Sequence, residues 1–167
     1  MKKVAQFYKV SYDQFKKDWK ETFGDSEDII KNTYDNIQLP QRSTVGSAGY
    51  DFISTLEFSL NPGETIKFPT GIRCKMKEEY VLMMFPRSSL GFKYQLMLCN
   101  TTGVVDSSYY YADNEGHIWI KFVNNGKDVV RVKEGDKVCQ GIFFEYGITE
   151  DDDVSELRTG GIGSTGR

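Results

Sequence analysis

Short apolar runs separated by turn-forming residues dominate the chain after residue 45. The runs that we expect to form strands cover residues 65–68, 80–85, 96–99, 118–123, 129–132 and 138–144. The first follows the turn sequence Asn61-Pro62-Gly63, and the second follows the polar Lys77-Glu78-Glu79. Many short strands at this spacing predict an all-β sandwich or barrel.

The stretch from Tyr12 to about Tyr34 has a different pattern. Phe15, Trp19 and Phe23 recur at helical spacing among lysines and acids, which predicts an amphipathic helix that ends at Gly24. A second short helix would begin at Asp25 or Ser26, both of which suit a helix cap. The aromatic stripe favours packing on the sheet, with binding of an unknown protein partner as the alternative.

Composition narrows the protein class. With 167 residues, 39% of them hydrophobic, the chain suits one globular domain, which we place at residues 1–155, followed by a mobile glycine-rich tail at 156–167. A net charge of −3 argues against nucleic-acid binding through a general basic surface. No apolar run is long enough to span a bilayer, and Met1 to Gln6 lack a signal-peptide core, so we expect a cytoplasmic protein without membrane contact.

The residue types that most often bind metals are sparse. Cys74, Cys99 and Cys139 are far apart and form no Cys-x-x-Cys pair, which indicates structural thiols rather than a zinc site or disulfides. His117 is the only histidine, in a strand-like segment, and we expect it to be packed there. The acidic run 150–153 lacks the turn-enforced spacing of a metal loop and is typical of a solvated linker.

The last ten residues, 158–167, place four glycines, three hydroxyl side chains and two arginines at one end of the chain. Dense glycines let backbone N–H groups converge on an anion, and arginine binds phosphate with two hydrogen bonds. The segment lacks the Gly-Lys-Ser/Thr ending of a P-loop, which argues against the common ATPase site. A solvated terminus fits the same composition, so the tail alone decides little.

Two inner segments carry related chemistry. Residues 86–91 follow a predicted strand and put Arg87 beside two serine hydroxyls at a turn, which suits phosphate. Residues 103–109 join Asp106 to Tyr109 three positions on, which suits a general base beside a stacking platform. Taken alone, each segment also fits an ordinary polar turn.

Together these segments resemble the homotrimeric dUTPases, which hydrolyse dUTP to dUMP and pyrophosphate. Five family motifs occur in order, and the resemblance covers about residues 37–167; the motifs lie at 47–51, 86–89, 103–109, 135–140 and 158–166. The resemblance implies a jelly-roll-like β-barrel, Mg²⁺ as cofactor and a homotrimer with shared sites. It also implies that the tail of one subunit completes the site of a neighbour.

The resemblance assigns roles to matching positions. Asp106 would be the general base that activates the water attacking the α-phosphorus, and Tyr109 would lie under the deoxyribose and exclude a 2′-hydroxyl. Asn100 would read uracil together with nearby backbone groups, and Gly103 and Val105 belong to the same substrate-binding segment. Asp51 would hold magnesium through its water shell.

The remaining positions implied by the resemblance contact the phosphates or close the site. The phosphate contacts in the body of the chain would be Arg87, Ser88, Ser89 and Gln140. In the tail, Arg158 would contact the γ-phosphate, while Gly163, Ser164 and Thr165 would close over the phosphate chain. Ile162 stands where the family usually has a phenylalanine that stacks on the base.

Other departures set this chain apart. Arg158 is one residue closer to Gly160-Gly161 than is usual in the family, and Ser89, Ser108 and Cys139 replace a common glycine, aspartate and alanine. After Tyr109, the usual Arg-Gly is replaced by a longer loop at 110–116. The helical stretch near residues 12–34 is an addition to the family core.

Two alternatives remain beside an active dUTPase. The related dCTP deaminases carry a catalytic glutamate three positions before an asparagine, whereas this chain has Lys121 three before Asn124, which argues against deamination. A non-catalytic, regulatory nucleotide-binding protein could use the same fold. The intact Asp106, Tyr109 and Arg87 favour the enzyme.

Overall fold

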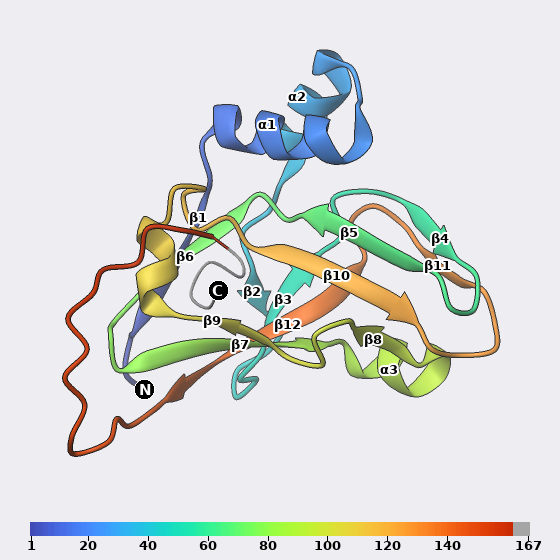
Figure 1. Ribbon diagram of the computed structural model, residues 1–167. Helices are drawn as coiled ribbons and strands as arrows, with labels where there is room; N and C mark the ends of the chain where they lie inside the picture. Colours follow the sequence, from blue (N-terminus) through green and yellow to red (C-terminus); the bar gives the residue numbers. More distant parts are fainter. Residues whose placement is uncertain (162–167) are drawn as a thin grey trace.

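The computed structural model describes residues 1–161, and most of its regular structure is antiparallel β (Figure 1). The strands are β1 (Ala5–Lys9), β2 (Gln41–Arg42), β3 (Tyr50–Ile53), β4 (Phe58–Leu60), β5 (Thr65–Pro69), β6 (Ile72–Met76), β7 (Tyr80–Pro86), β8 (Leu96–Leu98), β9 (Gly103–Val105), β10 (Trp119–Asn124), β11 (Val130–Val132) and β12 (Lys137–Glu145). The helices are α1 (Tyr12–Phe23), α2 (Glu27–Asn36), α3 (Ser88–Tyr94) and the 3₁₀-helix η1 (Ser107–Tyr111).

The strands form four antiparallel sheets in the described part of the chain. The largest has the order β2-β3-β12-β7-β9, and a second has the order β5-β10-β8. Two-stranded pairs, β1-β6 and β11-β4, complete the body. This arrangement confirms the all-β, jelly-roll-like fold that the strand pattern and the resemblance predicted.

Alternation of buried and exposed side chains along the strands produces a single hydrophobic core. In β7 the side chains of Tyr80, Leu82 and Met84 are buried, and those between them are only partly so. From the second sheet, Phe68 and Phe122 are fully buried, with ring centroids 6.4 Å apart. Period-two burial of this kind is typical of strands with one face on a common core, as in sheets packed face to face.

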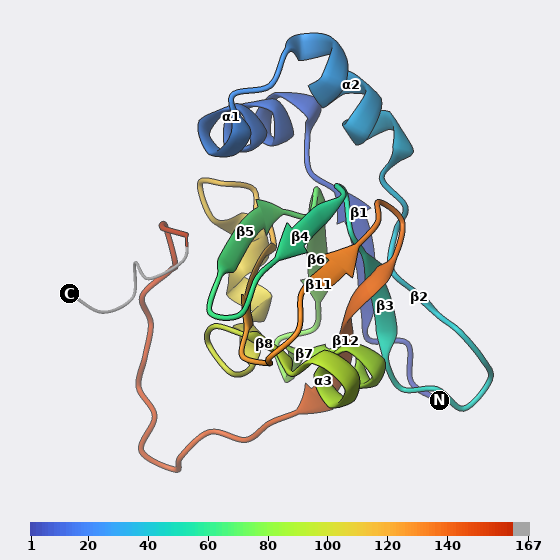
Figure 2. The same cartoon turned by 90° about the vertical axis from the view of Figure 1, so that its right-hand side faces the viewer.

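The helices α1 and α2 form a hairpin that covers one end of the β body (Figures 1 and 2). The Ser11 side chain caps α1 by accepting a hydrogen bond from the backbone N–H of Gln14, and Gly24 ends the helix with a φ of 72°. Phe15 and Trp19 are buried in the common core. The aromatic stripe of α1 therefore packs on the β body, which is the first of the two interpretations of its sequence pattern.

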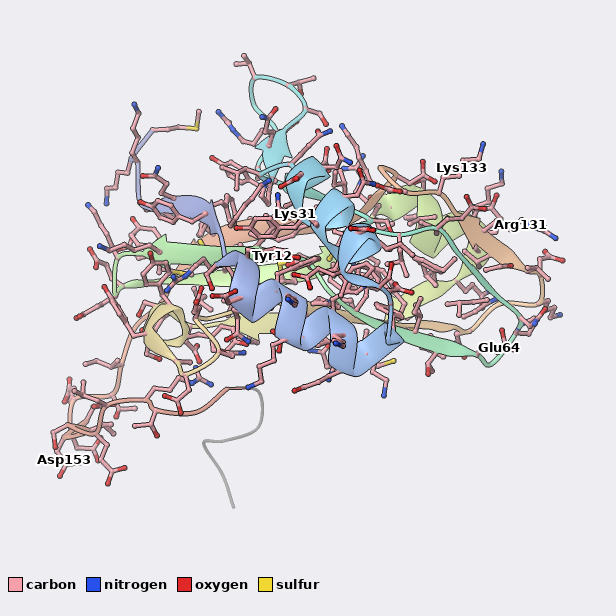
Figure 3. The ribbon with its side chains drawn as sticks, turned by 90° about the horizontal axis from the view of Figure 1, so that it is seen from above. Tyr12, Lys31, Glu64, Arg131, Lys133 and Asp153 are labelled. Atoms are coloured by element: carbon pink, nitrogen blue, oxygen red, sulfur yellow. The ribbon has the colours of Figure 1, made fainter. Side chains whose placement is uncertain are left out.

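The glycine Gly71 lies at a tight contact between the hairpin and the sheets. A Cβ added at Gly71 would come within 2.2 Å of Ile37 Cδ1, and the residue has a φ of 73°. A larger residue there would require the Ile37 side chain to shift and would be strained at this positive φ. Seen from above, the hairpin crosses the body, with Tyr12 and Lys31 on its two helices (Figure 3).

Several elements differ from the sequence expectation. The predicted strands at 65–68, 80–85, 96–99, 118–123, 129–132 and 138–144 are all present with small shifts of their ends. Residues 88–94 form helix α3 instead of a simple turn, and the short strands β1, β2, β3, β4, β6 and β9 were not expected. The helix contains Gly91 and buries none of its residues, so it carries no helical hydrophobic stripe.

Other expectations can be compared with the structure. All three cysteines are free; Cys74 and Cys139 are buried, which raises the pKa of each thiol to about 12, and Cys99 is exposed. The acidic residues 150–153 are exposed. Among residues 1–161, no helix combines the length and the apolar character needed to cross a membrane.

Candidate functional site

Asp51 is the centre of a compact group of charged side chains at the end of β7. Its Oδ1 accepts a hydrogen bond of 2.7 Å from Arg87, and its Oδ2 accepts one of 2.6 Å from Ser43. Lys137 Nζ lies 2.8 Å from Oδ2. Burial alone would raise the pKa of Asp51, but hydrogen bonds from Lys137 and Ser43 and the charge of Arg87 hold it below its usual value.

Strand pairing brings Gln140 into this group. In the register of β12, Gln140 lies opposite Asp51 of β3 and also opposite Phe85 of β7. Its amide donates a hydrogen bond of 3.4 Å to the carbonyl of Pro86. A Cβ added at Gly49 would meet Gln140 Oε1 at 2.5 Å, which explains the glycine in the first motif.

Ser88 and Ser89 form the first turn of α3, directly after Arg87. The backbone N–H groups of a first turn have no partner within their own helix, and they therefore suit an anion. Arg87, Ser88, Ser89, Asp51 and Gln140 thus come from the ends of neighbouring elements. We call these five residues together with Ser43 and Lys137 the Asp51 cluster.

The Asp51 cluster leaves limited room for a metal ion. Both oxygens of Asp51 already accept hydrogen bonds, so a direct bond to Mg²⁺ would displace a cation or a hydroxyl. Mg²⁺ commonly keeps several waters and binds through few carboxylates plus substrate phosphates. The residues fit a hydrated ion that touches Asp51 through water. Within residues 1–161, no group of three or more His, Cys, Asp or Glu side chains could hold a metal.

A cavity of about 510 Å³ lies on the other side of β7. It is bounded by the segment before and within β9, by η1 and by β10; its lining residues are Lys67, Met84, Leu98, Cys99, Asn100, Gly103, Val104, Val105, Tyr109, Ile118, Trp119, Ile120, Lys121 and Arg158. The volume suits a small organic ligand. Five positions predicted from sequence therefore share one cavity: Asn100, Gly103, Val105, Tyr109 and Arg158.

Asp106 lies next to this cavity, between β9 and η1. Its side chain is 54% exposed, and Arg158 donates a hydrogen bond of 3.2 Å to Oδ2. The guanidinium of Arg158 also lies 5.2 Å from the centre of the Tyr109 ring. The arm that follows β12 thus returns to its own chain and brings Arg158 onto the predicted base and the predicted stacking ring.

Tyr109 is fixed at its hydroxyl end. The hydroxyl donates a hydrogen bond of 2.6 Å to the carbonyl of His117 and accepts one of 2.8 Å from Asn114. Burial raises the pKa of the Tyr109 hydroxyl, which keeps it protonated and able to donate. The ring therefore has one orientation in the cavity wall.

β7 joins the two parts of the site. Its Met84 pairs with Gly103 of β9 on one edge and with Gly141 of β12 on the other. The cavity and the Asp51 cluster consequently lie on the two sides of one strand. The predicted contacts Ile162, Gly163, Ser164 and Thr165 lie outside the described residues.

Some members of the site were not singled out from the sequence. Ser43 and Lys137 complete the Asp51 cluster, while Lys67 and Trp119 line the cavity, with Lys67 Nζ 4.3 Å from the Trp119 ring. Lys137 belongs to the fourth motif, which was a usable signal. Ser43 and Lys67 reach their places only through strand pairing, for which the local sequence gives no signal.

The sequence of this chain matches a known protein family. The family model described as dUTPase matches residues 35–166. The "Deoxyuridine 5'-triphosphate nucleotidohydrolase" of Lactococcus lactis is 40% identical over 143 residues, which cover 84% of this chain and 95% of that protein. The protein of the same name from Desulfitobacterium hafniense is 36% identical over 137 residues, which cover 77% and 87%.

Solved structures agree in fold. The dUTPase of Streptococcus mutans aligns with a TM-score of 0.63 at 28% identity, covering 86% of this chain and 98% of that one. The dUTPase from phage phi11 of S. aureus aligns with a TM-score of 0.64 at 20% identity, covering 93% and 98%, which supports the fold alone. Since the family match spans most of the chain and includes every described motif, the protein belongs to the dUTPase family of enzymes.

Proposed function

We propose that this protein hydrolyses dUTP to dUMP and pyrophosphate by attack of water on the α-phosphorus. The observation that carries the proposal is that Asn100, Tyr109 and Arg158 line one cavity and Asp106 lies beside it, hydrogen-bonded to Arg158, in a chain of the dUTPase family. The cavity offers apolar walls for a base and sugar. Charged groups for phosphate lie at the cavity and across β7.

Asp106 is the proposed general base. Its carboxylate is exposed to solvent, so a water molecule can reach it, and no nucleophilic side chain is needed. Arg158 now occupies one of its oxygens. In the proposed cycle the triphosphate draws the guanidinium away, because phosphate oxygens accept two hydrogen bonds from arginine, and the carboxylate is then free to deprotonate water.

Substrate selection is assigned to the cavity wall. Asn100, with the backbone of Gly103 and Val105, would read the uracil edge, and the fixed Tyr109 ring would contact the deoxyribose and leave no room for a 2′-hydroxyl. A rigid ring discriminates by shape, because it does not move aside for the larger sugar.

The Asp51 cluster is the proposed phosphate side of the site. Arg87, the first turn of α3 and Gln140 would bind phosphate oxygens. When bound, Mg²⁺ would neutralise charge that builds on the leaving pyrophosphate. Asp51 would accept hydrogen bonds from waters of that ion while it keeps Arg87 in place.

A homotrimer is part of the same proposal. Apolar side chains remain exposed in the described part of the chain, among them Val104, which lines the cavity, at 59% and Met97 at 40%. Exposed apolar groups of this kind are commonly buried by a partner subunit. The proposed trimer would also bring the Asp51 cluster of one subunit toward the cavity of another.

The test is a comparison of nucleotides. The protein is incubated with Mg²⁺ and each deoxynucleoside triphosphate, and pyrophosphate release is measured with and without a chelator. Selective turnover of dUTP that stops when the metal is removed is the expected result. Release of ammonia from dCTP would show a deaminase. We do not expect this outcome, because Lys121 lines the cavity at the position where deaminases carry a glutamate. Binding of dUTP without turnover would show a non-catalytic protein.

A further inference from the structure

The loop 112–118, which joins η1 to β10, contacts the helical hairpin on one side and Tyr109 on the other. Toward the hairpin, His117 Nδ1 lies 2.5 Å from Asp18 Oδ2 of α1. Toward the cavity, the His117 carbonyl accepts the hydrogen bond from the Tyr109 hydroxyl. One residue therefore touches both the added helices and the ring that faces the ligand.

The hydrogen bonds of His117 define its protonation state. The backbone N–H of Gly71 donates a hydrogen bond of 2.8 Å to Nε2, so this nitrogen carries no proton. Nδ1 then carries the proton of the neutral ring and donates it to Asp18. Burial would raise the pKa of Asp18, but hydrogen bonds from His117 and Gln14 outweigh it and lower that pKa below its usual value.

A second attachment holds the same loop. Glu115 accepts hydrogen bonds of 2.7 Å from the backbone N–H of Ser11 and 2.6 Å from the Ser11 hydroxyl, at the start of α1. The loop also presses on the backbone of Tyr109, because a Cβ added at Gly116 would lie 2.5 Å from the Tyr109 carbonyl oxygen. Movement of this loop would therefore move both ends of Tyr109.

We propose that Asp18 and His117 are positioning residues for Tyr109, and that the helical hairpin thereby sets the discrimination between deoxyribose and ribose nucleotides. The inference rests on the proposed function, because it assigns the sugar contact to Tyr109. Asp18 binds His117, His117 places its carbonyl, and that carbonyl fixes the Tyr109 hydroxyl. Without Asp18, a buried N–H loses its acceptor, and the loop shifts to find another.

The geometry supplies a conservative rescue. A single oxygen, Asp18 Oδ2, accepts both the hydrogen bond from His117 and one of 2.9 Å from Gln14. Asparagine can place its one carbonyl oxygen there, whereas alanine offers no acceptor. Asp18→Asn should therefore keep Tyr109 in place, and Asp18→Ala should not.

The experiment measures kcat/KM for dUTP and for UTP in the full chain. We expect Asp18→Ala to narrow the dUTP/UTP ratio about tenfold, since small misplacements of a positioning group have effects of this size or larger. Asp18→Asn should restore most of the ratio. Ile30→Val, which weakens a fully buried position of α2 outside the hydrogen bonds that join Asp18, His117 and Tyr109, is the matched stability control and should lower Tm without changing the ratio.

A double-mutant cycle identifies the route. Tyr109→Phe removes the hydroxyl through which Asp18 acts, so Asp18→Ala should add little to the narrowing that Tyr109→Phe already causes. If Asp18→Ala does not fold, Glu115→Ala takes its place in the same cycle, because Glu115 is only partly buried and holds the other side of the loop.

Two results would overturn the inference. The first is an unchanged dUTP/UTP ratio of kcat/KM in folded Asp18→Ala. The second is a double variant in which the effects of Asp18→Ala and Tyr109→Phe on that ratio multiply, as they would for independent residues. Failure of the proposed function has a different signature. In that case the unaltered protein itself shows no preferential turnover of dUTP, before any variant is compared.

Discussion

At the residue scale, the two aspartates of the site have opposite surroundings. Asp51 is only 5% exposed and is held by Arg87, Lys137 and Ser43, whereas the Asp106 side chain is 54% exposed and contacts Arg158. A carboxylate enclosed by cations is suited to hold neighbouring groups in place. An exposed carboxylate at the cavity edge is suited to meet water, which is why the base is assigned to Asp106.

The first prediction concerns this base. Asp106→Asn should lower kcat for dUTP by about two to four orders of magnitude, the usual contribution of a positioned general base. The affinity for a non-hydrolysable dUTP analogue should remain near that of the unaltered protein, because Asp106 does not line the cavity. Single-turnover kinetics and calorimetry measure the two quantities. Near-normal turnover would place the base elsewhere.

At the element scale, the longest strands and the hairpin could be predicted because each carries its own signal. β12 is a nearly continuous apolar run, and α1 has an aromatic stripe closed by Gly24. β1 and β2 could not be recognised, because β1 is defined mainly by its pairing with the remote strand β6, and β2 has only 2 residues. Asp18 offered an unused signal: it lies at the buried face of α1, beside Trp19 and three residues after Phe15.

The second prediction concerns the attachment of this hairpin at low pH. Asp18 and Glu115 both have pKa values below their usual ones, because for each of them hydrogen bonds outweigh the opposing effect of burial. Groups of this kind stabilise the fold fully above their unfolded-state pKa of about 4. Their contribution is lost as the pH falls through the lower folded-state values.

We therefore expect the Tm of the unaltered protein to fall more steeply below about pH 4 than the Tm of Asp18→Asn/Glu115→Gln, which has neither titrating group. Thermal melts between pH 7 and pH 3 provide the comparison. The Lys16–Glu27 ion pair lies elsewhere on the hairpin, so Glu27→Gln serves as a control for charge removal. Parallel curves for the unaltered and doubly substituted proteins would contradict the prediction.

At the scale of the whole molecule, the sequence could predict which segments carry site chemistry but not how they meet. Asp106 and Tyr109 are three positions apart, so their proximity follows from local structure. Arg158 reaches Asp106 across 52 residues, and Gln140 reaches Asp51 only because β12 pairs with β3. Strand order and register decide such contacts, and neither is encoded within a single motif.

The arm that follows β12 is long and carries exposed apolar side chains. After β12 ends at Glu145, the chain runs without a helix or strand through residue 161, and Asp153 lies at its outer bend, far from the hairpin (Figure 3). Ile148, Val154 and Leu157 are strongly exposed along the way. Residues 146–157 can span roughly 40 Å when extended, and this length suits contact with a neighbouring subunit of the proposed trimer. Exposed apolar residues on a long connection favour burial against such a neighbour.

The third prediction concerns removal of this end. Deleting residues 158–167 should leave the body folded, because the last strand ends before the deletion and Arg158 is not part of the hydrophobic core. The kcat/KM for dUTP should nevertheless fall by about a hundredfold or more, as the phosphates lose an arginine and the cavity loses its cover. A small change in kcat/KM with an unchanged Tm would show that the arm does not contribute to the site.

The last prediction separates an arm that serves its own subunit from one that serves a neighbour. In the single chain Arg158 rests on its own Asp106, and in the proposed trimer a neighbour's arm would take that place. Chains lacking residues 158–167 keep Asp106, and Asp106→Asn chains keep the arm. If the arm acts between subunits, mixing the two inactive proteins under conditions of subunit exchange should restore part of the dUTP turnover, because some sites then combine both intact parts.

Mass spectrometry verifies the exchange, and self-mixed samples of each variant are the controls. Mixed trimers without recovered turnover would show that each arm closes the cavity of its own chain.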